Sequence, residues 1–334
     1  MLTVRSILCP VDFSEHSRRA LLWASAITRH RGGGLTVLSV VEPLLAAAAE
    51  IRLGVDLART EVEPALRDFV EATLPEDVRQ AAHVRMEVMA GAPAEAILQT
   101  SRRLRAGLIV MGTHGLGGFR KFLLGSTTEE VLRQTEWPVL AVPAGAVRAP
   151  AVEHPGLQLR KILLATDFRE SAMAATQWAG DLAADISVPL VLAHVVEPVF
   201  APPQWQSLVV DFEGDRVASG QRLLAQLSAS LRDTHNDCVV SVGRPAETIA
   251  SLAVEHEAGL VVMGLANPRD SERHKPGSIA YRVLRTGDVA VVVVPACCAK
   301  VDPLDETQRV DRSEGSGAVL HDGHAQDLRI AECL

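Results

Sequence analysis

The residues best suited to chemistry lie in one glycine-rich stretch, VMGTHGLGGFRKFLLGSTTEE. Gly112 ends an apolar run, and Gly125 with Ser126 opens a helical pattern, so a strand, a glycine loop and a helix start follow one another. Glycines allow a backbone to approach a ligand closely, and the first N–H groups of a helix attract anions. The stretch therefore predicts a phosphate site, in which Gly115 shapes the loop and Thr127 adds a hydroxyl.

Two better-known phosphate motifs do not occur in the chain. There is no Gly-Lys dipeptide for a Walker A lysine, and no G-x-G-x-x-G follows the first strand. The alternative interpretation is that these glycines only form turns and a helix start. Asp12, at the end of the first predicted strand, favours phosphate binding, although it could instead cap the next helix. Ser14 can also fill that capping role.

The same glycine spacing occurs a second time, in VMGLANPRDSERHKPGSIAYR. Gly264, Gly277 and Ser278 keep the positions of the first stretch, but Asn267 replaces its second glycine. The asparagine side chain occupies space near the phosphates, and the rewritten loop carries acidic residues that repel them, against several basic ones. We therefore expect the second site to be weakened or altered.

The two stretches belong to a duplication of a whole domain. ILCPVDFSEHSRRALLWASAI resembles ILLATDFRESAMAATQWAGDL, with Asp12 matching Asp167 and Trp23 matching Trp178, both 155 residues apart. GAPAEAI likewise matches GRPAETI 152 residues later. A period near the size of a domain indicates tandem domains rather than a short solenoid repeat.

The duplication sets the predicted domain boundaries. We expect an N-terminal domain over 1–146, a linker rich in Pro and Ala over 147–158, a C-terminal domain over 159–296 and a polar, flexible tail over 297–334. The total of 334 residues fits two domains of ordinary size.

Each copy alternates strand and helix patterns. Strands are predicted in the first copy at 5–12, 35–41, 83–90, 107–112 and 138–143, with helices at 14–31, 45–73, 94–105 and 126–135. Strands are predicted in the second copy at 161–167, 189–196, 238–243, 259–264 and 289–295. Such alternation is typical of a doubly wound α/β fold with a parallel sheet, where ligands bind beyond the carboxyl ends of the strands.

Composition narrows the class of function. The net charge of −8 argues against nucleic acid or an anionic membrane as a partner. The five cysteines are odd in number and include no CxxC, so a disulfide framework or zinc site is not expected and a reducing cytoplasm fits. No signal peptide and no apolar run of spanning length is recognised. The Cys297-Cys298 pair is either redox-reactive or, as we favour, a small apolar pair at a strand exit.

The pattern G-2x-G-9x-G-[S/T], preceded by PVDFS, resembles the ATP-binding type of the universal stress protein family, and the two copies resemble its tandem members. The resemblance covers nearly all of 1–296. It implies an adenine nucleotide α-hydrolase-like fold, with two tandem doubly wound domains that each contain a five-stranded parallel sheet in the order 3-2-1-4-5. It also implies that the last strands pair the two domains as an intrachain pseudo-dimer; a homodimer is a further alternative.

The resemblance implies an ATP site at the carboxyl ends of strands one and four. Its residues near the adenosine are Pro10, Val11, Asp12, Val40, Val41, Met111 and Gly112. Its residues near the phosphates are Gly115, Gly125, Ser126 and Thr127. The corresponding positions in the second copy are Asp167, Gly264, Gly277 and Ser278. Asp12 would bind ribose hydroxyls or help to hold a metal, and Mg²⁺ is a plausible bridge between phosphates. Strand valines are usually core residues, which is the alternative for Val40 and Val41.

The resulting hypothesis is a cytoplasmic, ATP-binding stress-response regulator, with nucleotide mainly in the N-terminal domain. Its nucleotide state would alter its conformation or its binding to an unidentified protein partner. No strong general base faces the predicted γ-phosphate, so no enzyme activity and no catalytic residue is predicted. The alternatives are an interaction module with vestigial nucleotide sites, and a slow ATPase or adenylyl-transfer enzyme.

Overall fold

The computed structural model describes residues 6–113, 124–143, 159–202, 204, 206–231, 234–265, 278–286 and 289–298. These belong to one compact unit, Met1–Ala299. The predicted linker, nearly all of the predicted tail, Gly115, Asn267 and Gly277 lie outside the described residues.

The first half alternates strands and helices: β1 (Ser6–Pro10), α1 (Glu15–Arg31), β2 (Gly34–Val41), α2 (Pro43–Leu53), the π-helical turn η1 (Ala58–Val62), α3 (Glu63–Thr73), α4 (Glu76–Ala81), β3 (Arg85–Ala90), α5 (Pro93–Leu104), β4 (Leu108–Gly112), α6 (Ser126–Gln134) and β5 (Val139–Val142). The second half repeats this order: β6 (Ile162–Ala165), α7 (Glu170–Ile186), β7 (Leu190–Val196), α8 (Gln206–Ser230), β8 (Asn236–Val242), α9 (Pro245–Glu255), β9 (Leu260–Leu265), α10 (Ser278–Thr286), β10 (Ala290–Pro295) and the 3₁₀ turn η3 (Ala296–Cys298). All ten predicted strands are found, within a few residues of their predicted ends.

The prediction of one helix over 45–73 was wrong. The helix α2 ends at Gly54, whose φ of 63° is left-handed and whose N–H donates to the carbonyl of Glu50, and the chain becomes α-helical again only in α3. Glycine adopts this conformation without the penalty that a Cβ atom brings, so it ends the helix despite the continuing apolar pattern.

The ten strands form one sheet in the order β3-β2-β1-β4-β5-β10-β9-β6-β7-β8. Within each half the strands are parallel and follow the predicted order 3-2-1-4-5. The halves meet where β5 and β10 pair antiparallel, with Leu140 opposite Val292. The last strands therefore join the halves, as predicted. Because this one pairing is antiparallel, the strands of the first half and those of the second half point in opposite directions.

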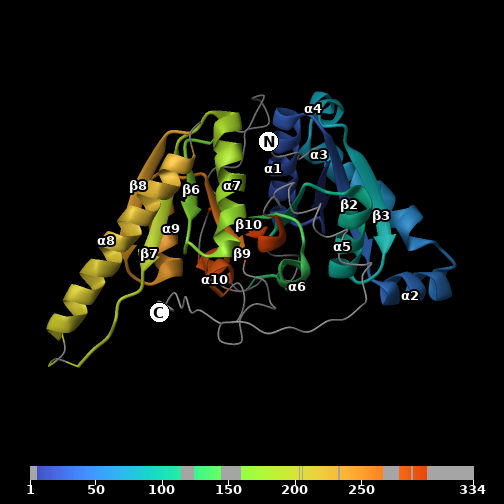
Figure 1. Ribbon diagram of the computed structural model, residues 1–334. Helices are drawn as coiled ribbons and strands as arrows, with labels where there is room; N and C mark the ends of the chain where they lie inside the picture. Colours follow the sequence, from blue (N-terminus) through green and yellow to red (C-terminus); the bar gives the residue numbers. More distant parts are fainter. Residues whose placement is uncertain are drawn as a thin grey trace, which may run out of the picture. The chain divides into compact units, whose positions relative to one another are not determined.

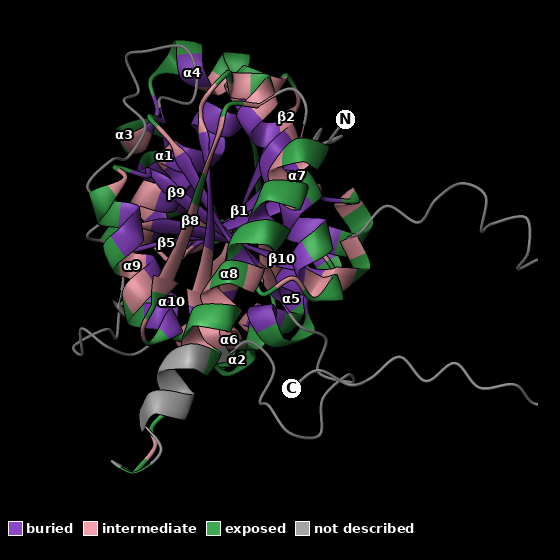
Figure 2. Ribbon diagram, turned by 60° about the vertical axis from the view of Figure 1, so that its left-hand side comes forward, coloured by how far each residue is buried: buried purple, intermediate pink, exposed green. Residues whose placement is uncertain are grey.

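Helices cover both faces of the sheet (Figure 1). One apolar cluster packs α1, α3, α4, α7 and α8 against one face, and a second packs α5, α6, α9 and α10 against the other. Each cluster contains residues of both halves, so the core is continuous across the β5–β10 junction. Figure 2 shows the buried strands inside and the exposed helix faces outside.

Among the helices that the structure describes, none has the length and apolar character needed to cross a membrane.

Candidate functional site

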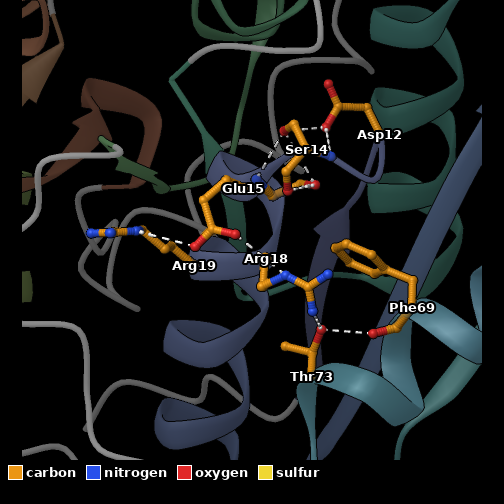
Figure 3. A network of polar contacts seen from close by, with 8 residues as sticks. Asp12, Ser14, Glu15, Arg18, Arg19, Phe69 and Thr73 are labelled. Atoms are coloured by element: carbon orange, nitrogen blue, oxygen red, sulfur yellow. Dashed lines mark hydrogen bonds and ion pairs between the residues drawn. The ribbon is translucent and has the colours of Figure 1, made fainter.

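Asp12 follows β1 and organises the start of α1. Pro10, the last residue of β1, and Val11 are buried. One Asp12 carboxylate oxygen, Oδ1, accepts hydrogen bonds from the Ser14 N–H at 3.2 Å and from the Ser14 hydroxyl at 2.6 Å. The Ser14 hydroxyl accepts in turn from the N–H of Ser17 at 3.2 Å and so caps α1. Ser14 is therefore the N-cap, and Asp12 orients it, while its second oxygen points away from Ser14 (Figure 3).

The first turn of α1 is also held to α3. The Arg18 guanidinium donates to the Thr73 hydroxyl at 2.6 Å and lies over the Phe69 ring, 4.7 Å from its centroid. The ring of Phe13 meets Phe69 edge to face at 5.6 Å. Glu15 pairs with Arg18 at 3.4 Å (Figure 3). These contacts fix the conformation of the turn that carries Asp12.

Gly112 ends β4 against the first turn of α1. A Cβ atom built on Gly112 would lie 2.8 Å from His16 Cβ and 2.9 Å from the His16 carbonyl carbon, closer than such atoms approach in proteins. Its counterpart Gly264 has the same restriction, because a Cβ there would lie 2.7 Å from the Ser171 carbonyl carbon. Both glycines are thus required by helix–strand packing. The sequence pattern alone could not distinguish this requirement from a role in ligand binding.

The glycine loop of the first half ends at the start of α6. Gly125 is the N-cap, with no side-chain hydrogen bond to cap the helix, and its N–H donates to the Thr113 carbonyl at 2.8 Å. The Thr128 hydroxyl donates to the Gly112 carbonyl at 2.9 Å. Ser126 is exposed and Thr127 is half-buried. The first N–H groups of a helix have no acceptor within that helix, so this end of α6 can receive an anion.

Sequence reasoning missed Thr113 and Thr128. Both are buried, at 0% and 3% exposure. The Thr113 carbonyl accepts from the Gly125 N–H and the Thr128 hydroxyl donates to the Gly112 carbonyl, so the two threonines tie the start of α6 to the end of β4. The sequence feature that could have pointed to Thr128 is its position in the first turn of the helix, two residues after Ser126. Nothing in the residue pattern indicated that its hydroxyl turns back to Gly112.

Three of the residues predicted to lie near the adenosine, Val40, Val41 and Met111, lie at the ends of β2 and β4. Met111 is 4% exposed and belongs to the apolar cluster under α5 and α6, and Val40 packs partly buried against that cluster. Val41 is 4% exposed, and its carbonyl accepts from the N–H of Gly91 at 3.0 Å. Met111 and Val40 therefore support the sheet edge as core residues.

The equivalent edge of the second half has different polar contacts. Thr166 stands at the position of Val11, and its hydroxyl accepts from the Phe168 N–H at 3.1 Å. His194 Nδ1 lies 2.9 Å from the Thr166 carbonyl, and the His194 ring lies against Phe168 with centroids 4.6 Å apart. Asp167 is exposed, accepts from the Arg169 N–H at 3.1 Å and faces the Arg169 guanidinium at 3.8 Å.

The helix α7 lacks the serine cap of α1. Its N-cap is Arg169, with no side-chain hydrogen bond to the first turn. Ser278 is the first residue of α10, as Ser126 is of α6. The structure thus keeps the helix starts in both halves but changes the groups beside them.

Within the described part of the chain, no group of three or more His, Cys, Asp or Glu side chains is arranged to hold a metal ion.

The model of the universal stress protein family matches the chain twice, over residues 3–143 and 158–295. The chain belongs to the universal stress protein family. A universal stress protein of Thermus aquaticus is 33% identical over 151 residues, which cover 41% of this chain and 98% of that protein. One from Mycolicibacterium smegmatis is 26% identical over 307 residues, covering 87% and 97% of the two chains.

Solved universal stress proteins share the tandem fold. A crystal structure from Archaeoglobus fulgidus superposes with a TM-score of 0.58 at 22% identity, covering 87% of this chain and 96% of that one. At that identity the likeness concerns the fold. The α/β class and the tandem arrangement read from the sequence are thereby confirmed.

Proposed function

We propose that this universal stress protein binds ATP in its N-terminal half, across the carboxyl ends of β1 and β4. The observation that supports this most is the start of α6. Gly125 offers no capping side chain there, so the N–H groups of the first turn and the hydroxyls of Ser126 and Thr127 are available to phosphate oxygens. The helix dipole favours negative charge at the same point.

Asp12 supplies the second part of the proposed site. Its carboxylate lies just after β1, beside the first turn of α1, where its Oδ1 atom accepts from Ser14 (Figure 3). A carboxylate oxygen in this position suits the ribose hydroxyls or a water molecule of a phosphate-bound Mg²⁺. Gly112, Gly115 and Gly125 would let the backbone follow the phosphates.

Binding of ATP in the N-terminal half would then change the position of a helix in the C-terminal half. The Tyr281 hydroxyl of α10 donates to the carbonyl of Glu129 in the first turns of α6, at 3.3 Å. Because α6 starts at the proposed phosphate site, a shift of its first turn on ATP binding would reach α10 through this contact. We propose that the protein is a cytoplasmic stress-response regulator whose nucleotide state alters its binding to a protein partner.

The second half would bind ATP poorly. Asp167 is paired with Arg169, and His194 packs against the Phe168 ring and lies 2.9 Å from the Thr166 carbonyl at the corresponding edge. The Asn267 substitution in the loop points the same way.

Charge reversal at the two helix starts tests the site. In Ser126→Asp the new carboxylate stabilises the helix dipole, so folding should be unharmed, but it repels the phosphates. The matched control is Ser278→Asp at the same position of α10. We expect calorimetry to show ATP binding in the parent and in Ser278→Asp, with affinity at least ten-fold weaker in Ser126→Asp.

Two results would contradict the proposal. No binding of added ATP by the parent, together with no nucleotide released on denaturation, would remove the nucleotide function. Binding of two equivalents of ATP per chain, with one of them lost in Ser278→Asp, would contradict the proposal that the second half binds ATP poorly.

A second candidate function is an interaction module with vestigial nucleotide sites. The helix α2 favours it, because Leu44 and Ile51 are 84% and 82% exposed and Leu45 is 59% exposed. Large apolar side chains gathered on a surface often mark a binding face. Partner capture that is unchanged by ATP and by Ser126→Asp would favour this candidate over the first.

A further inference from the structure

Two adjacent cysteines, Cys297 and Cys298, lie in the turn η3 directly after β10. The duplicated domain does not need cysteine at this point, because the positions 152 residues earlier hold Gly145 and Ala146. Cys298 is partly buried and packs against an apolar cluster, as a small apolar residue would. Cys297 is exposed, so an apolar packing role does not account for it.

Both thiols reach one oxygen atom of the other half of the molecule. The Cys297 Sγ atom lies 3.6 Å from the Glu136 carbonyl oxygen, and the Cys298 Sγ atom lies 3.3 Å from the same oxygen. The acceptor is held in place, because the Thr135 hydroxyl accepts from the Trp137 N–H at 3.0 Å and donates to the Trp137 carbonyl at 2.9 Å. A shared acceptor keeps the two sulfur atoms on the same side of η3.

The two thiols differ in accessibility and in acidity. Burial, and then the charge and the hydrogen bond of Cys297, raise the pKa of the Cys298 thiol to about 12. Cys298 therefore keeps its proton at neutral pH, and Cys297 is the thiol that solvent reaches. An accessible thiol that reacts first, beside a second thiol that can displace the product, is the arrangement found at reversible oxidation sites.

A metal ion is the other occupant that two thiols could take. Structural zinc sites use four ligands, mostly Cys and His. Around the pair, the side chains that the structure describes supply no third His, Cys, Asp or Glu in a position to complete such a set. A disulfide needs only the two sulfur atoms, so the arrangement favours oxidation over metal binding.

We propose that Cys297 and Cys298 form a reversible oxidation site for hydroperoxides such as hydrogen peroxide. The Cys297 sulfur attacks one peroxide oxygen, the O–O bond breaks, and the departing oxygen takes the Cys297 proton and leaves as water, which gives a sulfenic acid. The Cys298 sulfur then attacks the Cys297 sulfur, an S–S bond forms, and the hydroxyl leaves with the Cys298 proton as a second water. The two thiols lose two electrons and the peroxide gains them, so no further reactant is needed. The site does not depend on the proposed binding of ATP.

The disulfide would close a small ring around one peptide bond. Adjacent Cα atoms are about 3.8 Å apart, whereas disulfides usually join Cα atoms about 4.4–6.8 Å apart. The ring is therefore strained, and a dithiol reduces it readily. Its formation also uses both S–H groups, so the Glu136 carbonyl loses both donors and η3 loses this contact with the first half.

Mass spectrometry of the full chain tests the site, after treatment with increasing amounts of hydrogen peroxide and alkylation of the remaining thiols. We expect the peptide with Cys297 and Cys298 to lose two hydrogen atoms and to resist alkylation, and dithiothreitol to restore both thiols. The internal control is Cys238, which is also exposed and donates to a backbone carbonyl but has no adjacent cysteine, so it should proceed to sulfinic acid. Sulfinic acid at Cys297 beside an unreacted Cys298, a link from Cys297 to Cys333, or a Cys297 that stays reduced while Cys238 reacts would each overturn the proposal.

Two variants separate the roles of the thiols. Cys298→Ala supplies the residue type of Ala146 and removes the thiol that closes the ring, so Cys297 should continue to sulfinic acid as Cys238 does. Cys297→Ala leaves only the partly buried thiol, which should react about ten-fold more slowly than Cys297 does in the first variant. Equal rates in the two variants, or a Cys297 that stays free of sulfinic acid without Cys298, would contradict the assigned roles. The result for the parent chain decides the question if a variant fails to fold.

Discussion

The first turns of α1 and α7 occupy the same place in the two halves but are held differently. In α1, Asp12 orients Ser14 and Ser14 caps the helix. In α7, the cap position is Arg169, which binds Asp167 instead of the helix backbone. The sheet order and the packing glycines are nevertheless the same in both halves.

The difference shows where a duplicated domain can change. The contacts retained in both halves are dense and buried, and a change there would leave a clash or a cavity. The contacts that differ lie at the carboxyl edge of the sheet, where each contributes on the order of 1 kcal/mol and can be replaced. We therefore expect substitutions at the shared contacts to have large and similar effects, and substitutions at the edge to affect one half.

The largest effect is expected at the packing glycines. Gly112→Ala forces a Cβ against His16 of α1, and Gly264→Ala forces one against the backbone of Ser171 in α7, so each should lower the free energy of unfolding by about 3 kcal/mol. Gly34→Ala is the control, because a Cβ there meets nothing within 4 Å. Urea denaturation measures all three, and a loss at Gly112 or Gly264 no larger than that at Gly34 would contradict the packing argument.

A smaller, one-sided effect is expected at the helix caps. Ser14→Ala removes the cap of α1 and should cost about 1–2 kcal/mol. Arg169→Ser gives α7 the side chain that α1 has and should stabilise the protein by about 0.5–1 kcal/mol. Thermal unfolding of the two variants measures the difference. Destabilisation by Arg169→Ser would show that its pair with Asp167 matters more than a cap.

The next effect concerns Thr128, whose counterpart on α10 is Ala280. Thr128→Val keeps the shape of the side chain but leaves the Gly112 carbonyl without its hydroxyl donor, which should cost about 1 kcal/mol. Because this bond closes the loop at the proposed phosphate site, ATP affinity should fall several-fold as well. Calorimetric titration checks the affinity, with Ala280→Ser as the control that leaves it unchanged.

The smallest effect is expected from Cys9 of β1. Burial raises the pKa of its thiol above the ordinary value of 9.0, so the folded protein keeps the proton while the unfolded chain loses it. Stability should therefore fall as pH rises through that value, by about 0.4 kcal/mol at pH 9 for this group. The residue of β6 that corresponds to Cys9 is Leu164, so the second half contributes no such group. Cys9→Ala should therefore remove this part of the pH dependence. Urea denaturation at pH 7 and at pH 9.5 compares the two proteins, and identical pH dependence would contradict the assignment.

Much of the fold was predictable because it rests on local pattern and on the repeat. Ten apolar runs bounded by turn residues predicted the strands, and the match of Asp12 with Asp167 predicted two domains of one fold. The failure at 45–73 arose because apolar periodicity continues through Gly54, and a single left-handed residue decides where the helix ends.

The candidate site was predictable only in part. The residue pattern identified Gly112, Gly125 and Ser126, but it assigned Gly112 to a ligand without detecting its contact with His16. It left the cap of α1 open between Asp12 and Ser14, because both side chains can accept the same N–H group.

The sequence by itself determined the duplication, the alternation of strands and helices, and the family to which the chain belongs, since each depends on residue types at fixed spacing. Only the tertiary structure decided the antiparallel register in which β5 pairs with β10, that Thr128 returns to Gly112, and that Gly112 packs against His16. These contacts join residues far apart in the chain, and their geometry depends on how whole elements pack, which no local pattern records.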